Sequence, residues 1–67
     1  MAPREIVATK VKRLRERRGL TQEALAEKAG ISRTYLARLE TARHDPTLSM
    51  LEKLAKALRV KVGRLLE

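Results

Sequence analysis

Donor-rich side chains crowd the start of one short stretch of the sequence, AGISRTYLARLE, which runs from Ala29 to Glu40. Arg33 and Thr34 lie at its opening, and Arg38 follows about one helical turn later. Arginine can donate two hydrogen bonds to a guanine edge, and threonine can contact a thymine methyl group or exchange one hydrogen bond. On an arbitrary basic helix the same side chains would be only its solvated face. Their role therefore depends on the elements that position them.

Those elements begin with two helix starts of one design. Each has a Ser or Thr that can cap the helix, a hydrophobic residue before the cap and a leucine in the first turn after it. The cap satisfies free backbone N–H groups, and the two apolar residues fix the angle at which the chain enters the helix. The two sets are Leu20, Thr21 and Leu25, then Ile31, Ser32 and Leu36. With Gly30 between them, the pattern predicts two short helices joined by a tight turn.

The rest of the chain is also predicted to be helical. An apolar stripe at helical spacing runs over about residues 4–18, and a stronger one runs over residues 48–58. A last segment, around residues 62–66, is weaker, because Gly63 lowers helix propensity and Lys61 stands where a Ser or Thr cap would be better. The sequence therefore predicts an all-α fold, a compact bundle of five short helices in a single domain over residues 1–67.

Composition narrows the classes of function. The 67 residues carry a formal net charge of +8, from 16 Lys and Arg against 8 Asp and Glu, which favours a polyanionic partner. There is no cysteine, and the lone His44 cannot make a metal site, so we expect neither a metal nor a cofactor. Without a nucleophile–base arrangement or a phosphate-binding glycine loop, we expect no enzyme. One aromatic residue, Tyr35, gives no stacking platform for single-stranded nucleic acid.

No apolar run approaches the roughly 20 residues that span a bilayer. The basic N-terminal stretch also lacks the continuous apolar region of a secretory signal. We therefore expect a cytoplasmic protein without a membrane partner.

Three stretches together resemble the lambda-repressor-like, or Cro/Xre-type, helix-turn-helix family of bacterial and phage transcription regulators. They are RLRERRGLTQEALAEKAGIS, YLARLE and DPTLSMLEKLAKAL. The resemblance covers about Ile6 to Leu66 and implies a helix-turn-helix unit at residues 21–40, whose recognition helix, Ser32–Glu40, enters the major groove. Two departures concern loops, because Ala42 and Arg59 stand where the family commonly has glycine after its third and fourth helices.

This resemblance implies roles for individual residues. The N-terminal residues of a recognition helix reach base edges, so Arg33 and Thr34 are the first candidates for base contacts, and Arg38 reads a base or holds a phosphate. The candidates for contacts with the DNA backbone are Gln22, Tyr35, Thr41 and Arg43, with His44 a weaker one.

Alternatives stay open at three of these positions. The ring of Tyr35 packs beside Leu39, with or without its hydroxyl reaching a phosphate. Gln22 is either a clamp on the DNA backbone or an exposed residue of a first helical turn. The resemblance also implies that Arg15 and Glu40 meet in a partly buried salt bridge.

We expect a sequence-specific regulator that binds a palindromic operator in double-stranded DNA as a homodimer. One domain presents one recognition helix, and dimers read two half-sites. The apolar tail either provides the dimer surface or packs on its own core; its residues are Val60, Val62, Leu65 and Leu66. The alternative is an antitoxin or interaction module of the same fold that acts through a protein partner.

Overall fold

The computed structural model describes residues 3–67 and contains only helices in that range. Its elements are α1 (Pro3–Arg17), α2 (Gln22–Ala29), α3 (Arg33–Glu40), α4 (Leu48–Leu58) and a short 3₁₀ helix, η1 (Val62–Leu65). The all-α prediction is confirmed, but the count of five helices is wrong for the described chain. The fifth segment forms only a single 3₁₀ turn, since Lys61 makes no side-chain cap and Gly63 lies inside it.

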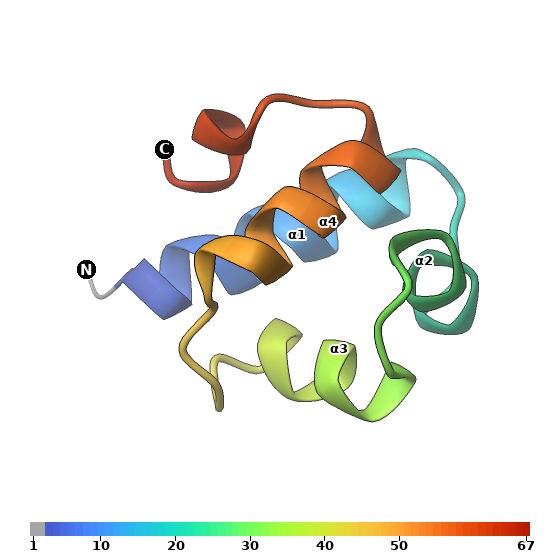
Figure 1. The fold of residues 1–67 in the computed structure, drawn as a ribbon, viewed down its shortest axis with the longest axis horizontal. Coiled ribbons are helices and arrows are strands. Elements are labelled where there is room, and N and C mark those ends of the chain that lie inside the picture. Colours follow the sequence, from blue (N-terminus) through green and yellow to red (C-terminus); the bar gives the residue numbers. More distant parts are fainter. Residues whose placement is uncertain (1–2) are drawn as a thin grey trace.

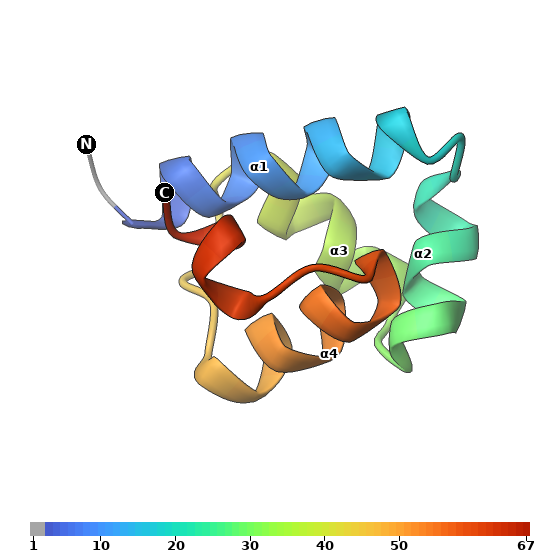
Figure 2. The ribbon, with the colours of Figure 1, turned by 90° about the horizontal axis from the view of Figure 1, so that it is seen from above.

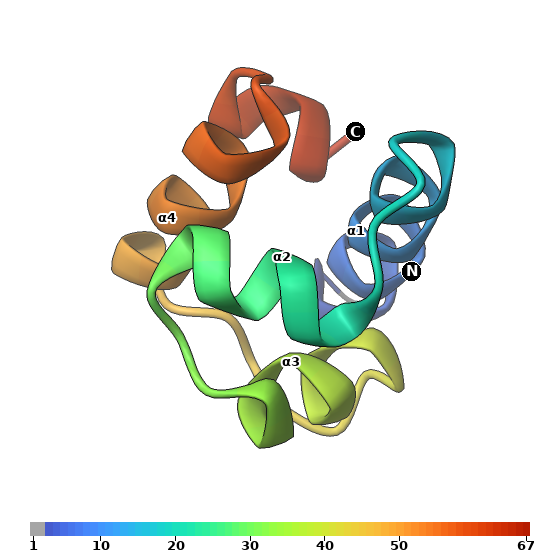
Figure 3. The same cartoon turned by 90° about the vertical axis from the view of Figure 1, so that its right-hand side faces the viewer.

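The helices enclose one core (Figures 1 and 2). α1 and α4 form two sides, α2 closes one end, and η1 lies between α1 and α4 at the other end. α3 packs on both α1 and α2, so the two helices of the predicted helix-turn-helix lie against each other. Figure 3 shows α3 beneath α2, with the chain turning sharply between them. None of the helices within residues 3–67 is long and apolar enough to span a bilayer.

Side-chain caps define the starts of three helices. The hydroxyl oxygens of Thr21, Ser32 and Thr47 accept hydrogen bonds of 3.0, 3.0 and 3.1 Å from backbone N–H groups in the first turns of α2, α3 and α4. The two predicted staples are in place, since Leu25 and Leu36 are fully buried and their partners Leu20 and Ile31 pack against the core. The orientation of α3 is thus fixed at its first turn.

All four α-helices stop in the same way. In each, a backbone N–H past the helix end returns to a carbonyl five residues earlier, as in the Schellman motif. These bonds, of 2.9 to 3.1 Å, are Leu20 to Arg15, Ile31 to Ala26, Arg43 to Arg38 and Val60 to Ala55. The motif needs a left-handed residue, and Gly19 and Gly30 provide it with φ of 67° and 70°.

The other two stops use residues that disfavour this conformation. Ala42 and Arg59 both have φ of 59°, in the left-handed region where a side chain costs about 1–2 kcal/mol. They are the two positions at which the sequence departs from the glycines common in the resembling family. The ends of α3 and α4 therefore adopt the same turn without glycine, and the backbone is strained there.

The core is built almost wholly of leucine, valine and alanine. Leu36 and Leu39 of α3 are fully buried in it, as is Leu65 of η1. Val60 and Val62 are half-buried against the same cluster. Most of the apolar tail therefore packs on its own domain, and Leu66 is its one exposed member, at 47%.

Candidate nucleic-acid interface

The outward face of α3 carries the donors that the sequence singled out. Its inward face buries Leu36 and Leu39. Arg33, Thr34 and Arg38 are left exposed on the opposite side. Neither arginine has an acidic partner within salt-bridge distance among residues 3–67. Two guanidinium groups on a helix face that form no salt bridge among residues 3–67 can donate to an external acceptor.

A partly buried ion pair ties the end of α3 to α1. Arg15 Nε donates to Glu40 Oε2 at 2.7 Å, and Arg15 Nη2 donates to Glu40 Oε1 at 3.1 Å, so the pair is bidentate. The side chains are only 12% and 2% exposed. Arg15 Nη1 also donates to the carbonyl of Leu20 at 2.8 Å. These three bonds connect α1, the turn before α2 and the last residue of α3.

The electrostatics of this pair follow from its burial. The hydrogen bond to Glu40 raises the pKa of Arg15 above its ordinary value, with burial opposing the shift in part. The guanidinium is therefore permanently charged; Glu40 is its only salt-bridge partner among residues 3–67, and Glu16 adds a weaker attraction. Hydrogen bonds between ionised groups are short and directional, which suits them to fixing one geometry.

Gln22 joins the same cluster. Its Nε2 donates to Glu40 Oε1 at 3.0 Å, which fixes the direction of its side-chain amide. Gln22 is the first residue of α2, where backbone N–H groups lack helical partners and an anion is favoured. A shallow concave surface lies here between the starts of α2 and α3, lined by Arg15, Thr21, Gln22, Glu23 and Arg33. The amide that would clamp a phosphate is thus already held by the end of the recognition helix.

A second concave surface lies on α3 itself. It is lined by Arg33, Thr34, Ala37 and Arg38, so two arginines flank the methyl groups of Thr34 and Ala37. Ala37 is not among the residues that the sequence singled out for a role. Its signal was only the helical spacing, since alanine offers no polar group. The structure brings it between the predicted base-contacting residues.

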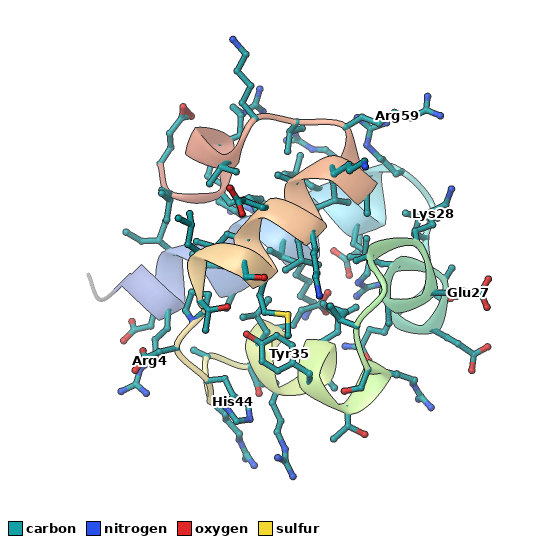
Figure 4. The ribbon with its side chains drawn as sticks, viewed as in Figure 1. Arg4, Glu27, Lys28, Tyr35, His44 and Arg59 are labelled. Atoms are coloured by element: carbon teal, nitrogen blue, oxygen red, sulfur yellow. The ribbon has the colours of Figure 1, made fainter. Side chains whose placement is uncertain are left out.

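Tyr35 faces a different environment from the arginines. Its ring stacks on His44, with centroids 5.5 Å apart and planes at 22°, as Figure 4 shows. Its hydroxyl is buried, faces the backbone of Thr47 and completes no hydrogen bond among residues 3–67. Burial raises the pKa of Tyr35, and the backbone of Thr47 lowers it in part. The geometry favours packing, and the hydroxyl is not presented to a phosphate in this structure.

The two remaining predicted residues lie at the end of α3. The hydroxyl of Thr41 donates back to the carbonyls of Ala37 and Arg38, at 3.3 and 3.0 Å, so its proton is already used. Arg43 is exposed in the loop before α4 and has no salt-bridge partner among the described residues. Of these two residues, Arg43 therefore has more side-chain donors available to an external acceptor.

Comparison with known proteins places this arrangement in a family. A helix-turn-helix family model matches residues 11–65. The immunity repressor protein of Bacillus phage phi105 is 49% identical over 57 residues, which are 85% of this chain and 40% of that protein. The crystal structure of the Neisseria hypothetical transcription factor NHTF has a TM-score of 0.94 at 36% identity, over 98% of this chain and 76% of that one. SinR, the master regulator for biofilm formation, solved in complex with DNA, has a TM-score of 0.87 at 34% identity, over 91% and 98%.

The fold is that of a helix-turn-helix DNA-binding domain, a class of regulators rather than of enzymes. The chain belongs to the helix-turn-helix family of the Cro/C1 type, and the resemblance seen in the sequence is confirmed. It spans less than half the length of the phage repressor that it matches.

Proposed function

We propose that this domain reads an operator in double-stranded DNA by inserting α3 into the major groove, and that it does so as a homodimer. The observation that carries the proposal is the division of α3 into two faces. Leu36, Leu39 and Glu40 hold the helix in place, which leaves Arg33, Thr34 and Arg38 exposed and unpaired. Transcription of the neighbouring gene would respond to occupancy of the operator. Because the target is DNA, we expect the protein to act in the cytoplasm.

The contacts divide into two kinds. Arg33 and Thr34, on the first turn of α3, would meet base edges, with Arg38 one turn further. Gln22 and Arg43 would hold the DNA backbone on either side, with Thr41 at the end of α3 as a weaker contributor. Tyr35 would support this surface by packing, since its hydroxyl is buried.

The expectation of a dimer rests on size. Two half-sites read from one side of a duplex lie about 34–36 Å apart. The described chain is only 28 Å along its longest axis and has one recognition helix, so a single copy cannot reach both. The large apolar side chains left exposed in residues 3–67 are Leu48, at 65%, and Leu66, at 47%. They are the places to test for contact between two copies.

Selection of bound sequences from random duplexes, combined with a solution mass measurement, tests the proposal. A palindromic consensus and a mass of two chains per duplex are expected. An unselective pool would contradict sequence-specific reading, and a single half-site with one chain would contradict the dimer. Leu48→Glu and Leu66→Glu, measured for mass in parallel, would locate the surface between the copies.

A further inference from the structure

A second basic surface lies away from α3. Two adjoining concave surfaces share Lys28, Ala57 and Arg59, and between them they gather five cationic side chains from α4 and from the C-terminal ends of α1 and α2. We call this set the basic patch; its members are Arg18, Lys28, Lys53, Lys56 and Arg59. Figure 4 shows Lys28 and Arg59 on the side of the molecule away from α3.

The patch is not neutralised from within the described chain. None of its five cations has a carboxylate within salt-bridge distance among residues 3–67. Glu27 and Glu52 adjoin Lys28 and Lys53 in the sequence but line neither concave surface. In Figure 4, Glu27 lies on the far side of Lys28 from Arg59. Gathering like charges in this way is unfavourable unless something external balances them.

Helix dipoles explain only part of this gathering. The C-terminal end of a helix carries about −0.5 of a charge and favours nearby Lys or Arg. Three such ends meet here, which amounts to at most about −1.5 against five full positive charges. The surface remains strongly positive after this compensation. Its cations therefore exceed what the three helix ends need, and the surface is suited to bind an anion.

The lining indicates the chemistry of the occupant. Apart from the aliphatic stems of its lysines and arginines, the patch contains only Ala29, Ala57 and the edge of Leu20. It has no aromatic or large exposed apolar side chain, and such anchors supply most of the affinity in protein–protein interfaces. Closely spaced lysines and arginines without an apolar anchor match a run of backbone phosphates, whose binding is electrostatic. This favours a nucleic-acid backbone over an acidic protein.

The position of the patch requires a second duplex segment. In Figure 3, α3 lies below α2, whereas the C-terminal ends of α1 and α4, which precede Arg18 and Arg59, lie above it. A straight duplex held by α3 would run on the α3 side of the domain, so Lys28 and Arg59 on the other side would lie outside its reach. We propose that the basic patch binds the phosphate backbone of a second segment of double-stranded DNA, so that one domain can hold two segments at once. This rests on the proposed function, since the first segment is the one that α3 holds.

Chemical-shift mapping on the ¹⁵N-labelled chain tests this with a probe that need not contain the operator. The probe is a short duplex of arbitrary sequence at low salt. Two sets of backbone amides should shift, one on α3 around Arg33 and Arg38, and one in the patch around Lys28, Lys53 and Lys56. Lys53→Gln with Lys56→Gln should weaken binding at the patch about tenfold while leaving the α3 set unchanged. The matched control, Lys12→Gln with Lys61→Gln, loses the same charge outside both surfaces and should keep both sets.

Each other outcome has a definite meaning. If only the α3 set shifts, or if both double variants lose the patch shifts equally, the second segment is overturned while the proposed reading by α3 stands. If only the patch shifts, the surface proposed on α3 fails and the patch remains. Titration with polyglutamate tests whether an acidic protein binds the patch instead of DNA. Binding of polyglutamate at the patch as tight as that of the duplex would overturn the assignment to DNA.

Discussion

Arg15 and Glu40 form a bidentate ion pair across 25 positions of the sequence, with Nε and Oε2 2.7 Å apart and the carboxylate 2% exposed. Removing one charge leaves the other buried without a counter-charge. We predict that Glu40→Gln lowers the free energy of unfolding by about 3 kcal/mol. Urea denaturation monitored by circular dichroism measures it. Because small domains have little stability to spare, the variant should also melt well below the parent.

An exposed pair in the same chain serves as the control. Arg4 and Asp45 are 3.7 Å apart, with side chains 47% and 83% exposed. Surface pairs contribute about 0–1 kcal/mol, so Asp45→Asn should change little. The double replacement Arg15→Met with Glu40→Leu should recover much of the loss, since it removes both charges. A Glu40→Gln variant as stable as the parent would show that the pair does not hold α3.

Replacing the left-handed residues Ala42 and Arg59 by glycine is predicted to stabilise the fold rather than to destabilise it. Both have φ of 59°, where a side chain is strained and glycine is not. Ala42→Gly and Arg59→Gly should each stabilise the fold by about 0.5–1 kcal/mol, after the extra chain entropy of glycine is counted. Differential scanning calorimetry of the single and double variants checks the gain. Lys53→Gly, in the middle of α4, should instead cost about 1 kcal/mol; equal losses at all three sites would contradict the strain.

Local patterns in the sequence were enough to predict the helix starts. The caps at Thr21 and Ser32 and the staples beside them depend on neighbouring residues only, and the structure has them in place. The count of five helices was wrong, because the last segment forms only a 3₁₀ turn, in which Leu65 packs on the core.

Contacts between distant residues could not be derived from local patterns. The Gln22–Glu40 hydrogen bond joins the first residue of α2 to the last residue of α3, so no residue spacing along the chain predicts it. The burial of the Tyr35 hydroxyl depends on where the loop before α4 folds back. Thr34 and Ala37 line one concave surface because they lie three residues apart on a helix. Only the structure shows that Arg33 and Arg38 line the same surface.

Base reading and backbone clamping predict different mutant behaviour. Arg33→Ala should lose about 1–3 kcal/mol and relax the preference at one base pair, because only a base contact distinguishes sequences. Gln22→Ala should weaken all sequences alike, since a phosphate contact carries no sequence information. Binding of each variant to a library of single-position operator variants separates the two cases. A uniform loss for Arg33→Ala would reassign it to the backbone.

The concavity formed by Thr34 and Ala37 predicts recognition of a thymine methyl group. Its two methyls lie between Arg33 and Arg38, which suits a thymine next to a guanine in the major groove. Replacing the contacted thymine by uracil removes one methyl and should weaken binding by about 0.8 kcal/mol, roughly fourfold. A fluorescence anisotropy scan with one uracil at a time would find the position. Ala37→Ser should reduce the difference between thymine and uracil there, and no methyl-sensitive position at all would contradict this reading.

Tyr35 predicts how stability depends on alkaline pH. Its hydroxyl is buried and completes no hydrogen bond among residues 3–67, and burial raises its pKa above the ordinary value of 10.0, with the nearby backbone of Thr47 lowering it in part. Above pH 10 the unfolded chain releases this proton while the folded chain retains it, so the free energy of unfolding must fall as pH rises. Tyr35→Phe should remove that part of the decline and, by deleting an unsatisfied buried hydroxyl, add about 1 kcal/mol at neutral pH. Denaturation curves of both proteins from neutral pH to about pH 11 measure the two effects together. Parallel declines would mean that the hydroxyl ionises as readily in the folded chain as in the unfolded one.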